Sequence, residues 1–133
     1  MRTRHINREV VLKKMAGKPI EVYSFFSGAG FLDLGFEKAG FDIVFVNEFN
    51  KQFLDVYQYA RRNNEKLPQY GYSNEDIRIF LSDENWCSRF PRYNDRTNKL
   101  IGFIGGPPCP DFSVAGKNEG ETGVNGQLTS VYV

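Results

Sequence analysis

The sequence has little of what metal sites and disulfide-rich folds require. Its 133 residues include two cysteines, Cys87 and Cys109, and one histidine, His5. A metal site needs several Cys or His ligands at short spacing, so none is expected. A cysteine–histidine hydrolase is also disfavoured, because its base would be His5, in a predicted tail. We expect both thiols to be reduced rather than joined in a disulfide.

Long apolar runs are also absent. No run reaches the ~18 residues that a membrane-spanning helix needs, although 41% of the residues are hydrophobic. The basic stretch 1–18 is not followed by an apolar segment with a small-residue cleavage site, so we predict no signal peptide. We therefore expect a cytoplasmic protein without membrane contact. It would comprise a polar extension, 1–18, and one compact unit, 19–133.

An excess of positive charge is missing as well. The 17 Lys and Arg residues nearly balance the 16 Asp and Glu residues, which gives a net charge of +1. A complete domain that reads DNA usually carries a basic stripe, and the clusters here are small: Arg61 with Arg62, and Arg89, Arg92 and Arg96. If the substrate is nucleic acid, most of the contact surface lies elsewhere. The aromatic residues, 15% of the chain, are expected mainly in the core.

Strand-like and helix-like segments alternate along the chain. Strands are predicted at 20–26, 41–47, about 75–80 and 100–105, helices at 31–39, 50–63 and from 127 onward, and irregular segments at 64–74 and 82–98. This alternation predicts an α/β fold with a partial Rossmann-like, doubly wound, mostly parallel sheet and ligands at the carboxyl ends of its strands. A partial sheet would expose an apolar edge, so self-association through that edge is expected.

A glycine-rich turn follows the first predicted strand. Gly28 and Gly30 allow the backbone to approach a ligand closely. The next glycine, Gly35, follows five residues after Gly30 rather than three, so the dinucleotide fingerprint is absent. Nicotinamide and flavin dinucleotides are therefore disfavoured.

Two acidic residues lie at candidate ligand positions: Glu48 ends the second predicted strand, and Asp76 lies in a short stretch that could close a strand or begin a turn. Glu48 lies 18 residues after Gly30, where a carboxylate, which only accepts hydrogen bonds, suits the two hydroxyls of a ribose. Asp76 is placed to accept from the exocyclic amine of adenine. Taken alone, Glu48 is more simply a solvated strand end and Asp76 a cap. In this order together they favour an adenosine-type ligand without pyrophosphate, which points to S-adenosylmethionine.

The last predicted strand runs into a proline-rich turn, Gly105-Gly106-Pro107-Pro108-Cys109-Pro110. Proline fixes φ, so a thiol here is held in place before a substrate arrives. The thiolate is the reactive form of cysteine. A packing cysteine more often lies inside an apolar run, and Cys87, beside Trp86, is most simply such a residue. Cys109 is therefore the candidate nucleophile.

Five segments carry a resemblance to a known family. They are Phe25 to Phe31, Asn47-Glu48-Phe49, Asp76-Ile77-Arg78, Gly105 to Ser113 and Gly123 to Val133. In this order and spacing they resemble the first five motifs of the DNA cytosine-5 methyltransferases, from about Ile20 to the end of the chain. The Pro-Pro-Cys-x-x-Phe-Ser segment is the most specific of them.

The resemblance implies a cofactor, a mechanism and roles for individual residues. The implied cofactor is S-adenosyl-L-methionine, bound by Phe26, Ser27, Gly28, Ala29, Gly30, Glu48, Phe49, Asp76, Ile77, Gly106 and Pro107. Glu48 would accept the ribose hydroxyls, Phe49 would face the adenine ring and Asp76 would accept the adenine amine. Cys109 would add to C6 of a cytosine flipped out of duplex DNA, and C5 would then take the methyl group.

The chain departs from the family pattern in two respects. Pro110 follows the catalytic cysteine, where the family commonly has Gln. The family's later Glu-Asn-Val and Gln-x-Arg-x-Arg motifs and its target recognition domain are not in these residues. We therefore expect the N-terminal part of a catalytic domain, inactive by itself, from an enzyme whose usual setting is restriction–modification. A tRNA cytosine-5 methyltransferase and a non-catalytic cofactor-binding or assembly module remain alternatives.

Overall fold

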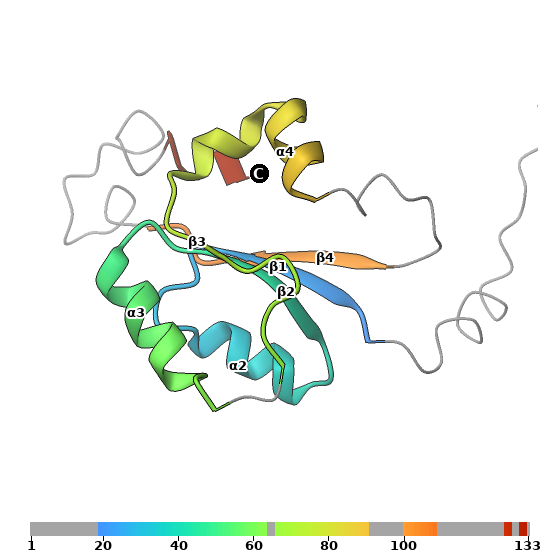
Figure 1. Cartoon of the computed structure of the whole chain (residues 1–133), viewed down its shortest axis with the longest axis vertical. Coiled ribbons are helices and arrows are strands. Elements are labelled where there is room, and N and C mark those ends of the chain that lie inside the picture. The colour runs from blue at the N-terminus through green and yellow to red at the C-terminus, as the bar shows by residue number, and fades with distance from the viewer. Residues whose placement is uncertain (1–18, 64–65, 91–99, 109–126, 129–130, 133) are drawn as a thin grey trace, which may run out of the picture.

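The structure is a computed structural model that describes residues 19–63, 66–90, 100–108, 127–128 and 131–132. Its elements are β1 (Glu21–Phe25), α2 (Phe31–Lys38), β2 (Asp42–Asn47), α3 (Lys51–Ala60), β3 (Tyr72–Ser73), the 3₁₀ helix η1 (Ile77–Leu81), α4 (Asp83–Arg89) and β4 (Ile101–Gly105). The strands form one parallel sheet in the order β3-β2-β1-β4. Figure 1 shows α2 and α3 on one side of this sheet and α4 on the other. The predicted α/β class and parallel sheet are confirmed.

The direction of winding reverses between β1 and β4. The chain runs outward from β1 through β2 to β3, and then returns to place β4 on the other side of β1. In open α/β sheets, ligands bind in the crevice outside the carboxyl ends of the strands at such a reversal. A ligand site is therefore expected at the residues that follow β1, β2 and β4.

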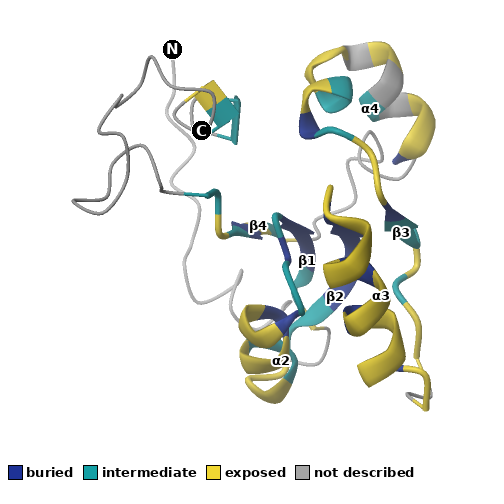
Figure 2. Ribbon diagram, turned by 90° about the vertical axis from the view of Figure 1, so that its left-hand side faces the viewer, coloured by how far each residue is buried: buried dark blue, intermediate teal, exposed yellow. Residues whose placement is uncertain are grey.

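Each face of the sheet has its own core, because successive side chains of a strand point to opposite faces. The α2/α3 side holds Val22, Ile43, Val46, Leu54, Tyr57 and Ile104. The α4 side holds Tyr23, Phe25, Val44, Phe45, Ile77 and Phe90. Figure 2 shows the buried strands between the largely exposed outer surfaces of α2 and α3 and the segment around α4. The expectation that aromatic residues fill the core is confirmed for the second cluster, where each such ring contributes roughly 1.5–3 kcal/mol.

An irregularity in β2 explains why two successive residues share one core. The pairing of β1 with β2 shifts register between Val22 and Tyr23, so that Tyr23 pairs with Phe45 rather than Val44. Val44 and Phe45 both pack into the α4-side cluster as a result. The ring centroids of Phe45 and Phe90 lie 4.7 Å apart in an edge-to-face arrangement, which is a favourable geometry for aromatic pairs.

Most predicted elements are confirmed, but three predicted segments, 64–74, about 75–80 and 82–98, were wrong. The strands at 20–26, 41–47 and 100–105 and the helices at 31–39 and 50–63 correspond to β1, β2, β4, α2 and α3, and the described residues from 127 onward are helical. The strand expected near 75–80 is instead η1, and the short third strand lies earlier, at 72–73, inside a predicted loop. Asp76 caps η1 by accepting from the Arg78 backbone N–H at 2.9 Å, which favours a helical turn over a strand.

The segment expected to be irregular at 82–98 contains α4. Its backbone bonds include Phe90 N–H to the Trp86 carbonyl at 2.9 Å, and both rings pack in the α4-side cluster. The helix is short and mostly polar, so its periodicity is weak, and its packing against the sheet stabilises it. Cys87 lies in α4, but its side chain is not among those described, so its predicted packing role stays a prediction.

The described residues hold no helix that is long and apolar enough to cross a membrane. Within the same residues, His, Cys, Asp and Glu nowhere form a group of three suited to a metal ion.

β3 and β4 are the outer strands of the described sheet, and Phe103 of β4 is 45% exposed. Self-association through such an edge stays a prediction. The proposed extension, 1–18, lies outside the described residues.

Candidate functional site

A cavity opens at the carboxyl ends of β1, β2 and β4. Its volume is about 480 Å³, which is in the range of small-molecule sites. The lining residues are Phe26, Gly28, Asn47, Glu48, Phe49, Asn50, Phe53, Asp76, Ile77, Arg78, Gly106, Pro108 and Leu128. The cavity therefore lies where the reversal of winding predicts a ligand.

Glu48 is the best-anchored acid of this cavity. Its side chain is almost fully buried. One carboxylate oxygen, Oε2, accepts from the Gly28 backbone N–H at 2.8 Å, and Oε1 accepts from the Asn50 N–H at 2.7 Å. The acid therefore links the glycine turn after β1 to the start of α3. Each oxygen keeps lone-pair capacity for a further donor.

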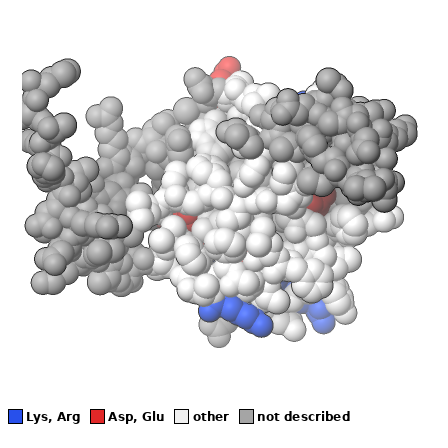
Figure 3. Space-filling view, turned by 180° about the vertical axis from the view of Figure 1, so that it is seen from behind, with Lys and Arg blue, Asp and Glu red and all other residues white. Residues whose placement is uncertain are grey.

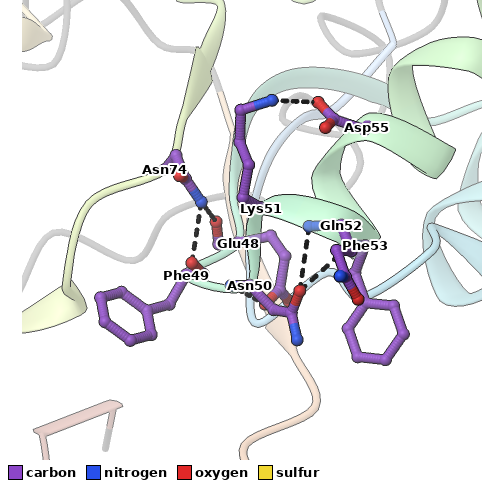
Figure 4. A network of polar contacts seen from close by, with 8 residues as sticks. All are labelled: Glu48, Phe49, Asn50, Lys51, Gln52, Phe53, Asp55 and Asn74. Carbon is purple, nitrogen blue, oxygen red and sulfur yellow. Dashed lines mark hydrogen bonds and ion pairs between the residues drawn. The ribbon is translucent and has the colours of Figure 1, made fainter.

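The segment that carries Glu48 is held by two asparagines. Asn50 caps α3, accepting from the backbone N–H groups of Gln52 at 3.0 Å and Phe53 at 3.4 Å. Asn74 donates to the carbonyls of Glu48 and Phe49 at 2.7 and 2.8 Å. Figure 4 shows these bonds and the rings of Phe49 and Phe53, which project away from the start of the helix. Both rings are more than half exposed, so their faces are available to a planar ligand.

The glycine turn has an unusual backbone. Phe26 has φ +50°, which is rare for a residue with a side chain, and Gly28 and Gly30 have φ +56° and +85°. The Ser27 N–H donates to the Asn47 carbonyl at 3.2 Å, which ties the turn to the end of β2. The Ser27 hydroxyl is buried and has no hydrogen-bond partner among the described residues. A buried hydroxyl of this kind has a donor and an acceptor available to a further partner.

Asp76 reaches the cavity as one half of an ion pair. Its Oδ1 accepts from Arg78 Nε at 2.8 Å, and its Oδ2 contacts the same guanidinium. Hydrogen bonding and the charge of Arg78 lower the pKa of Asp76 to about 2. The carboxylate is therefore ionised at neutral pH and can only accept hydrogen bonds.

The structure brings most of the predicted cofactor contacts together. Phe26, Gly28, Glu48, Phe49, Asp76, Ile77 and Gly106 line the cavity, whereas Ser27, Ala29, Gly30 and Pro107 are not among its lining residues. Cys109 lies outside the described residues, although its neighbour Pro108 lines the cavity. Whether these residues bind a cofactor stays a prediction.

Sequence reasoning missed six lining residues: Asn47, Asn50, Phe53, Arg78, Pro108 and Leu128. The position of Asn50 could have been recognised from the sequence, since Asn directly before a helical run is a typical helix cap. No sequence pattern pointed to Leu128, because it lies more than twenty residues after β4 along the chain. Its position depends on packing alone.

A buried polar network lies beneath the turn. Asp33 is fully buried and accepts from the hydroxyls of Ser24 at 2.7 Å and Tyr57 at 2.8 Å. Burial raises the pKa of Asp33 above its ordinary value of 3.8, against the opposing effect of these bonds. Burial also raises the pKa of Tyr57, so its hydroxyl stays protonated and donates.

Asp33 is expected to make folding pH-dependent. Because its pKa is higher in the folded state, the folded protein binds this proton more tightly, and stability falls as pH rises from 3.8 through the folded pKa. Asp33→Asn cannot titrate. We predict that the free energy of unfolding of the wild type, minus that of the variant, decreases in urea titrations over a pH range that begins at about 4 and extends upward. A difference that stays constant over this range would contradict the prediction.

Residues 20–133 match the family model of the C-5 cytosine-specific DNA methylases. The chain belongs to this family. The methylase chain is 45% identical over 130 residues to the type II methyltransferase M.NmeDI of Neisseria meningitidis serogroup C. It is 38% identical over 114 residues to M.FnuDI of Fusobacterium nucleatum. These alignments cover 96% and 86% of the methylase chain but 31% and 28% of its relatives.

A solved structure supports the same assignment. A protein described as a DNA modification methyltransferase encoded within a prophage (E. coli) superposes with a TM-score of 0.59 and 28% sequence identity. The match covers 85% of the methylase chain and 27% of the solved chain. The methylase chain thus spans about a third or less of these relatives, and it aligns with them over most of its own length.

Proposed function

We propose that the chain is the cofactor-binding and nucleophile-bearing part of a DNA cytosine-5 methyltransferase that uses S-adenosyl-L-methionine. The observation that carries the proposal is the placement of Glu48 in the cavity. Two backbone amides fix its carboxylate there, and the exposed Phe49 ring and the ionised Asp76 line the same cavity. The type II methyltransferases that the chain resembles support the transfer of a methyl group to DNA.

The residues of the cavity fit this cofactor. The remaining lone pairs of Glu48 suit the two ribose hydroxyls, Phe49 offers a face to adenine, and Asp76 accepts from the adenine amine. The glycine turn carries no side chain at Gly28, where an added Cβ would meet nothing within 4 Å. When bound, the cofactor supplies an electrophilic methyl group.

In the proposed reaction, the thiolate of Cys109 adds to C6 of a cytosine flipped out of the duplex. The addition would make C5 nucleophilic. The methyl group that the cofactor supplies would then form a bond to C5, and breakage of its bond to the cofactor sulfur would release S-adenosylhomocysteine. Loss of the C5 proton then expels the thiolate and restores the aromatic ring. Each bond formed by sulfur is broken again, so Cys109 is regenerated.

DNA contacts are proposed to come mostly from outside the described residues. On the face shown in Figure 3, the described surface is largely uncharged, and Lys and Arg side chains appear near its lower edge. Such a surface offers few partners for the phosphates of a duplex. Methyl transfer by the complete gene product to duplex DNA and to tRNA, measured side by side, would separate the proposed substrate from the RNA alternative.

Cofactor binding can be tested on the chain itself. We expect S-adenosylhomocysteine to bind at one site with a dissociation constant in roughly the micromolar range in calorimetric titrations. NAD⁺ is the matched control, because it contains the same adenosine and adds a pyrophosphate that the turn is not built to hold. Binding of NAD⁺ as tight as that of S-adenosylhomocysteine, or no heat with either, would overturn the assigned cofactor.

A further inference from the structure

Arg61 is a charged residue in a place where charge is costly. It follows α3 directly, at the end of the helix opposite Glu48, and it is 7% exposed. A guanidinium is rarely buried to this extent unless its donors are paired. Its partners therefore indicate what the residue does.

The guanidinium of Arg61 has three kinds of partner. One nitrogen donates to the Gly30 carbonyl at 2.9 Å. Two nitrogens donate to the carboxylate of Glu37 on α2, at 3.2 and 3.1 Å. The guanidinium carbon also lies 4.0 Å from the centre of the Tyr57 ring, a distance at which the cation is attracted to the ring face.

Gly30 is enclosed by these side chains. A Cβ at this position would lie 2.5 Å from the Tyr57 ring and 2.6 Å from Arg61. The Gly30 carbonyl accepts from Leu34 N–H at 3.0 Å as well as from Arg61, and the Gly30 N–H donates to the Ser27 carbonyl at 2.9 Å. Gly30, at the end of the turn, therefore packs directly against Tyr57 of α3 and against Arg61.

The two ends of α3 hold the two ends of the turn. At the start of the helix, Glu48 bonds both Asn50 N–H and Gly28 N–H. At its end, Arg61 bonds Gly30. A ten-residue helix is a stiff spacer of about 15 Å. A loss of the Arg61 contact would leave the turn held to α3 by the Glu48 bonds and by packing against Tyr57, without a hydrogen bond from α3 or its C-terminal cap to Gly30.

We infer that Arg61 is a positioning residue for the cofactor turn, and that it acts through the Gly30 carbonyl to hold the Gly28 amide against Glu48. The inference rests on the proposed function in one respect, namely that this turn binds the cofactor. The Arg61 guanidinium thus has two roles that can be tested separately. The contact with Glu37 joins α3 to α2, and the contact with Gly30 sets the turn.

The test separates these two contacts. Arg61→Met keeps an unbranched apolar stem and removes every donor, and Arg61→Lys restores one charged donor. Glu37→Gln is the matched control, since it removes the ionic partner and leaves the Gly30 contact in place. Hydrogen exchange of the unliganded chains and titration with S-adenosylhomocysteine are measured at a temperature where all four proteins are native by circular dichroism.

We expect Arg61→Met to speed exchange at the Gly28 and Gly30 amides and to weaken S-adenosylhomocysteine binding, each by about tenfold. The amides of β2 should be unchanged, and Arg61→Lys should recover part of both losses. Glu37→Gln should change either quantity by less than about threefold.

Unchanged exchange at the turn in Arg61→Met would overturn the inference. Equal effects of Arg61→Met and Glu37→Gln would do so as well, because the ion pair alone would then explain them. If the wild type binds no S-adenosylhomocysteine, the proposed function fails by itself, and the exchange rates still decide whether Arg61 holds the turn.

Discussion

Cys109→Ala in the complete gene product is expected to abolish covalent trapping by duplex DNA that contains 5-fluorocytosine, and to lower methyl transfer at least about a thousandfold. The fluorine replaces the C5 proton, so the adduct of the thiolate cannot eliminate and persists. Without the sulfur no adduct forms, and C5 stays a poor nucleophile. Denaturing gels of the trapped complex and transfer of a labelled methyl group measure the two effects.

Cys87→Ala is the control for this experiment. It removes the other cysteine, which lies in α4, and should leave both trapping and transfer intact. Cys109→Ala should still bind S-adenosylhomocysteine, because the substitution leaves every described lining residue of the cavity in place. An adduct that survives in Cys109→Ala would exclude the proposed nucleophile. Absence of trapping in the wild type would favour the non-catalytic binding module.

Glu48→Gln is expected to weaken S-adenosylhomocysteine binding about 30- to 100-fold, which corresponds to about 2–3 kcal/mol. The carboxylate accepts from two backbone N–H groups. An amide offers one acceptor oxygen, so its NH₂ would face one of these donors, and the turn would lose an anchor. The variant also lacks the negative charge that strengthens bonds to ligand hydroxyls. Calorimetric titration of both proteins measures the loss.

An analogue of S-adenosylhomocysteine without the two ribose hydroxyls tests the assigned role of Glu48. If this residue accepts those hydroxyls, the analogue should bind the wild type weakly, and Glu48→Gln should add little further loss. Glu75→Gln is the control, because Glu75 pairs with Arg89 and is absent from the lining of the cavity. Additive losses from the analogue and from Glu48→Gln would show that this acid shapes the turn without contacting the ribose.

Much of the candidate site could be predicted from local patterns. Gly28 stands in a turn directly after an apolar strand, and Glu48 ends the next strand, so the order of elements in a parallel sheet brings them to the same edge. The partners of these residues were not predictable in the same way. The sequence predicted Glu48 as an acceptor for ribose hydroxyls without any protein partner being named, and the structure shows both of its oxygens accepting from the backbone.

Asp76 shows the same limit of local reasoning. The sequence left open whether Asp76 closes a strand or caps a turn, and the predicted sheet placed a strand at about 75–80. In the structure Asp76 caps a 3₁₀ helix. The ion pair with Arg78, two residues later, was also not anticipated. Residues two positions apart also share one face of an extended strand, so the ion pair alone does not reveal the turn. The turn is shown by the Arg78 backbone N–H, which donates to Asp76 at 2.9 Å.

The sequence by itself determined the α/β class, three of the four strands, the helices α2 and α3, and the family to which the chain belongs. These follow from periodicity, from turn residues and from motif spacing, all of which are local. Tertiary structure alone decided that Arg61 meets Gly30, that Tyr57 reaches Asp33 and that Leu128 lines the cavity. Those contacts join residues more than twenty positions apart, and they exist because particular faces of helices and strands pack together.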